Sequence, residues 1–475
     1  MFLKTQVPPW RSFLAACIAL ALADGSFADP TPTDSPGNSS KNLWERQTLS
    51  GDWDSERSQL EEKGITFSLE YTHEYLANVS GGTRRQGEYN GLIVGGAEVD
   101  LEKLAHWNGG LFHADALSTL GNSLSARAIG DDSNVSNINY RNSLRLAELW
   151  LQQSFLDDRL ALRAGQLAWD VNFGGSAISD DLPGGDLFLN SDFGALPILS
   201  FNVPVPIFAI YAPGIMARIE PVENLYLQVA AYDGNPAPGD FGDPTPGARI
   251  GARRNDHGFR WRLAGDEGVL WAAEIGYRLH PSAQQEAETV PPVERLATHG
   301  ARRVHGETEG GQERLPGIYK LGCFYHSDEF TGFCTGEALG GNCGCYAVAS
   351  QMVWCEEGAQ GLTVFARAAL APEDRNVLDF AMDCGAVWKG VLPGRDDDNL
   401  GLAFSQKGYS DEFSAAELAV GGAAHGHESI LELSYEFRAA GWLSVQPDLQ
   451  YVIHPAGDPE ARNAWVIGCR STIVF

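Results

Sequence analysis

The sequence is short of positive charge and of long apolar runs. It holds 34 lysines and arginines against 62 aspartates and glutamates, which gives a formal net charge of −28. So acidic a chain repels phosphates, and the sequence therefore excludes nucleic acid as a partner. Beyond residue 28, no segment is long enough and apolar enough to cross a bilayer as a helix.

Motifs for catalysis and metal binding are missing as well. No Gly-x-Ser-x-Gly or His-Glu-x-x-His element occurs. The run from Gly394 to Asp398 lacks the later glycine and final glutamate of a calcium loop, so it predicts a turn. His425 and His427 offer two possible metal ligands, which we interpret as too few for a metal site. We expect no catalytic residues, no metal and no cofactor; an enzyme with a site built from scattered loops is one alternative.

The first residues do carry a clear signal. Lys4 and Arg11 precede an apolar core, and small residues follow it up to Ala28. This order predicts a secretory signal peptide over residues 1–28. Residues 29–46 are rich in proline, serine and asparagine and predict a flexible lead-in.

A period of two then dominates the sequence to its last residue. Apolar residues alternate with mostly polar ones from Ile65 to Thr72, from Leu431 to Arg438 and from Trp465 to Phe475. This alternation is typical of strands with one apolar face. We predict sixteen or seventeen strands, preceded by a short helix that begins after Ser50 or Asp52 and ends at Lys63.

The connections between these strands differ in length. Short turns, such as Asp157–Asp158, alternate with longer polar segments near 120–142, 170–213, 281–314 and 328–345. Short turns on one side and long loops on the other are the layout of an outer-membrane barrel. The predicted fold class is all-β: a transmembrane antiparallel β-barrel of about 16 strands over residues 47–475, with Phe475 on the lipid face. An acidic, secreted soluble protein is the alternative.

Several stretches resemble one known family. They are TLSGDWDSERSQLEEKGITFSLEYTHEYLANVSGG, ELWLQQSFLDDRLALRAGQLAWDVNF, YAPGIMARIEPVENLYLQVAAYDGNP, GVLPGRDDDNLGLAF and ESILELSYEFRAAGWLSVQPDLQYVIHPAG. Their order from about residue 47 onward is similar to that of the carbohydrate-selective porins of OprB type. The chain departs from the family at Asp54, where glycine is usual, and in the seven cysteines that follow the signal peptide.

The resemblance implies a bacterial outer-membrane channel for passive diffusion of glucose and related sugars. It implies mono- or oligosaccharides as substrates and outer-membrane lipid and lipopolysaccharide as surroundings, in a homotrimer or a monomer. The alternatives are a general, unselective porin or, with less support, a barrel enzyme or adhesin.

A channel for neutral sugars must offer hydrogen bonds rather than net charge. Arginine suits this task because its planar guanidinium carries five donors. Arg163 follows the Asp157–Asp158 turn, and we expect it to hold sugar together with Glu148 and Gln152 across the hairpin. The full set of expected lumen contacts is Arg163, Glu148, Gln152, Arg218, Arg260, Arg262, Lys320, Arg367, Glu432, Arg438 and Asp448. The alternative role for each is an interior salt bridge.

The segment 170–213 is the predicted constriction loop. It is too long for a simple connection, and it mixes aromatic rings with carboxylates. The residues expected to act there are Trp169, Asp170, Phe173, Phe188, Asp192 and Phe193. An external loop packed on the surface is the alternative.

Cysteine spacing gives one further expectation. Four cysteines fall within 334–355, which we interpret as part of one external loop, and the periplasm is oxidising. We predict at least one disulfide there. Cys323 and Cys469 lie on apolar strand faces and are expected to be free thiols.

Overall fold

A computed structural model describes residues 42–176, 184–237, 255, 257–261, 267–279, 315–356 and 360–475. The predicted signal peptide, residues 29–41 of the predicted lead-in, and Arg262 lie outside these residues. In the described part, every helix is too short or too polar to cross a membrane.

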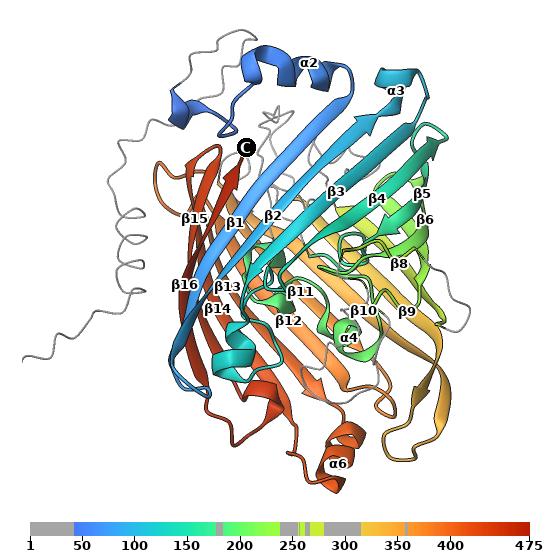
Figure 1. The fold of residues 1–475 in the computed structure, drawn as a ribbon, viewed down its shortest axis with the longest axis vertical. Coiled ribbons are helices and arrows are strands. Elements are labelled where there is room, and N and C mark those ends of the chain that lie inside the picture. The colour runs from blue at the N-terminus through green and yellow to red at the C-terminus, as the bar shows by residue number, and fades with distance from the viewer. Residues whose placement is uncertain are drawn as a thin grey trace, which may run out of the picture.

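Sixteen antiparallel strands close into one barrel, which confirms the predicted fold class (Figure 1). Each strand pairs with its neighbours in sequence, and β1 closes the barrel against β16. The strands are β1 (Ile65–Ser80), β2 (Gln86–Asp100), β3 (Gly110–Gly121), β4 (Ser143–Phe155), β5 (Leu160–Leu167), β6 (Ala212–Val222), β7 (Leu225–Asp233), β8 (Val269–Leu279), β9 (Gly317–Thr331), β10 (Ala338–Cys355), β11 (Gly361–Leu370), β12 (Leu378–Lys389), β13 (Asn399–Tyr409), β14 (His427–Ala440), β15 (Leu443–Ile453) and β16 (Ala464–Val474).

Alternation along the strands separates the outside of the barrel from its lumen. On β14, Leu431 and Leu433 are more than two-fifths exposed, whereas Glu432 between them is fully buried. Successive side chains of a strand point to opposite faces, so the apolar residues form the outer surface and the polar ones turn inward. We call the end of the barrel where β1 begins the turn end, and the opposite end the loop end.

Short helices lie at both ends of the barrel. At the turn end are η1 (Leu43–Glu45), η2 (Trp53–Ser55), α2 (Glu56–Glu62) and α3 (Leu101–Ala105); at the loop end are α6 (Asp411–Ala419) and η7 (Pro455–Gly457). The predicted N-terminal helix is confirmed, although it begins a few residues later than expected. Gly64 follows α2 with φ +87°, and a Cβ there would lie 2.7 Å from the carbonyl oxygen of Asp100.

Two of the predicted long loops are corrected by the strand order. Most of 328–345 is strand, because β9 runs to Thr331 and β10 starts at Ala338. The segment 281–314 lies outside the described residues, but β8 ends and β9 begins at the turn end. That connection therefore joins strands on the side where only short turns were expected.

Apolar residues also alternate with arginines from Phe259 to Leu263 in the sequence, which predicts a strand, and this prediction is wrong. Its described residues, 259–261, belong to no strand. The physical reason is that β7 pairs directly with β8, so no edge remains for another strand. Instead the segment lies beside β4, where the backbone N–H of Leu146 donates to the carbonyl of His257 at 3.0 Å.

The predicted disulfide within 334–355 is contradicted as well. In the part of the chain that the structure describes, none of the seven cysteines beyond the signal peptide takes part in a disulfide. Residues 338–355 form one strand rather than a loop, so Cys343 and Cys345 point side by side to the same face and Cys355 lies at the far end. The strand keeps these thiols apart.

Candidate functional site

Two long loops from the loop end fold into the barrel and pack against its inner wall. The β3–β4 loop (122–142) contains η3 (Ser125–Ile129), and the β5–β6 loop (168–211) contains η4 (Gly185–Leu187), η5 (Ser191–Phe193) and α4 (Pro197–Asn202). In Figure 1, α4 lies within the outline of the barrel. Hydrogen bonds from inward-facing strand residues hold both loops, which makes this inner region the candidate site.

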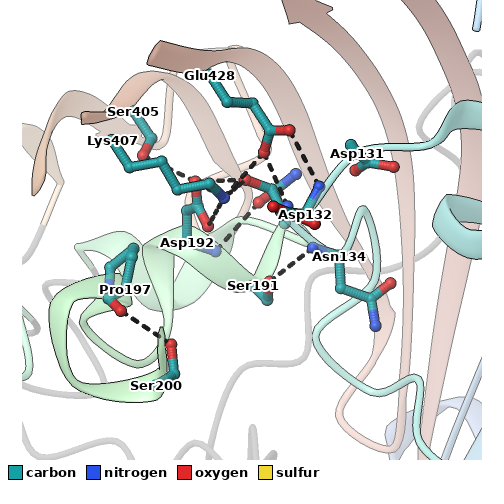
Figure 2. A network of polar contacts seen from close by, with 12 residues as sticks. Asp131, Asp132, Asn134, Ser191, Asp192, Pro197, Ser200, Ser405, Lys407 and Glu428 are labelled. Carbon is teal, nitrogen blue, oxygen red and sulfur yellow. Dashed lines mark hydrogen bonds and ion pairs between the residues drawn. The ribbon is translucent and has the colours of Figure 1, made fainter. Parts of the chain in front are cut away.

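Lys407 on β13 and Glu428 on β14 face each other directly in the strand register. Both are buried, and Lys407 Nζ lies 2.9 Å from Glu428 Oε1 and 3.3 Å from Asp192 Oδ1 (Figure 2). Ser133 Oγ contacts both Lys407 Nζ and Asp192 Oδ2. One cation of the wall thus joins residues of both inner loops.

Glu428 adds backbone contacts to this network. Its carboxylate accepts the N–H of Asp132 at 3.0 Å and of Ser133 at 2.8 Å, and it also accepts from the N–H of Ala456 in the β15–β16 loop. Burial, and then the charge of Glu428, raise the pKa of both Asp131 and Asp132. Two loops, β3–β4 and β15–β16, therefore meet at one carboxylate.

Arg367 on β11 fixes the β5–β6 loop from another side. Its Nε donates to Asp383 at 2.9–3.0 Å. Its two Nη atoms donate to the backbone carbonyls of Gly174, Asp192, Phe193 and Gly194 at 2.7–3.2 Å. These contacts occupy the guanidinium, so Arg367 positions the loop.

Glu432 and Asp448 lie on the same wall, on β14 and β15. Glu432 accepts the N–H of Leu189 and, at 3.1 Å, that of Asn190. Gln450 links the group, because it accepts from the Asn190 amide at 3.1 Å and donates to Asp448 at 2.9 Å. Glu432 directly, and Asp448 through Gln450, thus hold the segment that joins η4 to η5.

The structure brings Arg163 and Gln152 together as expected. Arg163 donates to Gln152 Oε1 at 2.8 and 3.1 Å and to Asn172 Oδ1 at 3.0 Å, and its guanidinium lies 4.0 Å from the centre of the Trp150 ring. Glu148, on the same inner face, accepts the N–H of Ala168 at 3.0 Å. Arg163 is only 2% exposed, so these contacts tie β4 and β5 to the β5–β6 loop.

Arg218 and Arg260 also have fixed partners. Arg218 on β6 donates to Glu220 at 3.1 Å and lies 4.0 Å from the Tyr226 ring centre. Arg260 lies in the connection between β7 and β8, where it pairs with Asp233 at 2.9 Å and with Glu267. Its position on a loop, rather than on a strand, corrects the predicted lumen strand.

The predicted constriction residues divide into two groups. Trp169, Phe173, Phe188 and Phe193 are almost fully buried and pack as pairs, with ring centres 5.8 Å apart for the first two and 4.9 Å for the others. Asp170 is partly exposed as a residue, and its Oδ2 accepts the N–H of Phe208 at 3.0 Å. Burial of its carboxyl raises the pKa of Asp170 to about 6.

Lys320 and Arg438 differ from the other predicted lumen cations. Both lie on inner faces near the turn end and are partly exposed. Within the described ranges neither takes part in an ion pair, although Nε of Arg438 is itself buried and has no hydrogen-bond partner there. Lys320 and Arg438 are therefore partly exposed cations of the inner face that lack an ion pair among the described residues.

Sequence reasoning missed Lys407, Glu428 and Ser133. Lys407 and Glu428 share the inward parity of their strands, which was a usable signal. Ser133 lies in an irregular loop, and nothing in its sequence surroundings indicates that it meets β13.

Comparisons with known proteins agree with this architecture. Residues 84–475 match the family model described as carbohydrate-selective porin, OprB family. Porin B of Pseudomonas aeruginosa is 27% identical, with all of both chains covered. A putative porin, QuiX, of Acinetobacter baylyi is 22% identical over 91% of this chain and 94% of its own. The high-pH structure of Pseudomonas putida OprB is 22% identical over 92% of this chain and all of its own, with a TM-score of 0.76.

Proposed function

The chain belongs to the carbohydrate-selective porins of the OprB family, and we propose that Lys320 and Arg438 are its sugar-contacting cations. It is an outer-membrane porin through which carbohydrates diffuse passively, and it is not an enzyme. Glucose and related sugars are the proposed substrates.

One observation supports the choice of Lys320 and Arg438. A group that helps a neutral sugar to pass must be reachable from the lumen and must have donors to spare. The guanidinium groups of Arg367 and Arg163 donate hydrogen bonds to protein oxygens, and both side chains are buried. Lys320 and Arg438 are partly exposed on inner faces and form no ion pair among the described residues, so the Lys320 amine and the terminal guanidinium nitrogens of Arg438 are the proposed donors.

The β5–β6 loop is the proposed constriction. It packs inside the barrel and is held by Arg367, by Glu432 and by the Lys407 network. The buried rings of Trp169 and Phe188 support a role in fixing the loop rather than in stacking on sugar. Direct sugar contacts by Arg163, Glu148 and Gln152 stay predictions, as does assembly as a homotrimer or a monomer.

Planar-bilayer recordings with glucose and glucose oligosaccharides test this proposal. Each of Lys320→Ala and Arg438→Ala should weaken sugar block of the current roughly five- to tenfold, which corresponds to about 1 kcal/mol for one lost hydrogen bond. Lys103→Ala is the matched control, since Lys103 is an exposed cation in α3 at the turn end.

Two outcomes would count against the assignment. Unchanged sugar block in both lumen variants would remove these residues from the sugar path. A wild-type pore that no sugar blocks would favour a general, unselective porin.

A further inference from the structure

Two cysteines lie opposite each other on neighbouring strands of the outer barrel surface. Cys323 on β9 and Cys345 on β10 are direct partners in the antiparallel register. Both are exposed free thiols. On β9 the outward neighbours Leu321 and Tyr325 are exposed, whereas Phe324 is buried toward the lumen. The pair therefore faces away from the channel.

The spacing of this pair fits a disulfide. Residues directly opposite in an antiparallel ladder have Cα atoms about 4.5 to 5.5 Å apart. Disulfides join Cα atoms roughly 4.4 to 6.8 Å apart and Cβ atoms about 3.5 to 4.5 Å apart. Only a small approach of the two side chains is needed.

No other two of the seven described cysteines are placed this way. Cys343 lies opposite Tyr325, and it is two residues from Cys345 on the same strand, about 6.6 Å away with parallel side chains. Cys355, at the end of β10, lies opposite Gly361, and Cys334 lies in the β9–β10 turn. On other strands, Cys384 lies opposite Ala366 and Phe404, and Cys469 lies opposite Tyr75 and Pro447.

We propose that Cys323 and Cys345 form a cross-strand disulfide before the barrel enters the outer membrane, with a periplasmic protein disulfide as the oxidant. The thiolate of one cysteine attacks the disulfide of the carrier, forms a mixed disulfide and releases one carrier thiolate. The thiolate of the second cysteine then attacks the sulfur of the first cysteine in the mixed disulfide and releases the other carrier thiolate. Two electrons pass to the carrier, and the two protons lost by the cysteines balance those that its thiolates take up.

The position of the pair on the outer surface requires that the disulfide form before the barrel is inserted into the membrane. In the finished barrel both thiols lie on the lipid-facing surface, where a soluble carrier has no access. The reaction needs only the β9–β10 hairpin, which local contacts can form in the periplasm, an oxidising compartment. Oxidation therefore precedes insertion.

The disulfide would fix the register of the hairpin. The pairing of β9 and β10 shifts between Gly340 and Asn342, where one strand has an extra residue. A slip by one residue would turn every side chain of β10 to the wrong face. A covalent link between Cys323 and Cys345 excludes that slip and restricts the unfolded chain.

Mass spectrometry tests the proposal on protein from outer membranes that is denatured in the presence of excess alkylating reagent and never reduced. We expect five alkylated cysteines and one cross-linked pair of peptides that contains Cys323 and Cys345. Protein from a strain without its periplasmic thiol oxidase should show all seven cysteines alkylated. Seven alkylated cysteines in the wild-type strain, or a link between other cysteines, would overturn the proposal.

Two variants provide matched controls. Cys343→Ser should keep the cross-link, whereas Cys345→Ser should abolish it and lower the folded fraction in the outer membrane severalfold. Sugar block of the current should stay the same in any Cys345→Ser protein that does fold, because the thiol lies outside the lumen. If Cys345→Ser does not accumulate, the wild-type peptide map decides alone.

Discussion

Arg57, in α2, donates a hydrogen bond of 3.0 Å to the carbonyl oxygen of Phe475, 418 positions later in the chain. The same guanidinium donates to the carbonyl of Phe67 at 3.0 Å and to Thr48 Oγ1 at 3.1 Å. Arg57 therefore connects the N-terminal segment with both strands of the closing seam, β1 and β16. Figure 1 shows α2 at the turn end, beside the end of β16.

Further contacts extend this seal. The N–H of Leu49 donates to the carbonyl of Val474 at 2.7 Å, and Trp442 Nε1 donates to the carbonyl of Leu43 at 2.9 Å. The rings of Trp44 and Trp442 lie 5.7 Å apart. The segment from Leu43 to Glu62 thus covers the place where the last strand meets the first.

Arg57→Ala should loosen the seam. The variant loses hydrogen bonds from a charged donor to two backbone carbonyls, a change worth about 1 to 3 kcal/mol. We expect the folded barrel to convert to the unfolded form at a lower temperature on gels run with unheated and heated samples. Lys63→Ala, at an exposed position just after α2, is the control and should behave like the wild type. Equal heat resistance of the Arg57→Ala and control proteins would refute a role in sealing.

Arg367→Ala should release the β5–β6 loop without removing a lumen strand. The change leaves Asp383 buried without its partner and frees four loop carbonyls, at a cost of about 3 to 5 kcal/mol. We expect larger, noisier single-channel currents and weaker sugar block. Arg367→Lys should not restore the wild-type current, since an ammonium group lacks the planar fork of donors. If the single-channel current of Arg367→Ala has the same size and as little noise as that of the wild type, Arg367 does not anchor the loop.

Asp170 predicts a pH dependence of the same loop. Its pKa is raised to about 6 in the folded loop by burial, above the ordinary value of an aspartate. The folded loop therefore holds a proton that the unfolded loop has already released, and its stability falls as the pH rises from about 4 through 6. Protease cleavage within 168–211, in detergent-solubilised protein, should increase over that range. Asp170→Asn should flatten the profile, and an unchanged profile in this variant would assign the effect to other groups.

The sequence was enough for the barrel because the barrel depends on local regularities. Alternation from Ile65 to Phe475 specifies strands with one apolar face, and sixteen such strands have all their backbone groups paired only when the sheet closes. Gly64 marked the end of the N-terminal helix by the same kind of local rule. Alternation failed at Phe259 and Trp261, because a period of two shows a tendency toward extended chain and not whether a partner strand is available.

The tertiary structure alone decided what the inward-facing residues do. Alternation turned Arg163, Arg367 and Glu432 toward the lumen, but only the course of the β5–β6 loop through the barrel determined that they meet protein oxygens and N–H groups there. The opposition of Cys323 and Cys345 likewise depends on strand register. A repeating pattern along the chain encodes the face on which a side chain lies, whereas its partner is set by contacts between residues far apart in sequence, and these exist only once the barrel has closed.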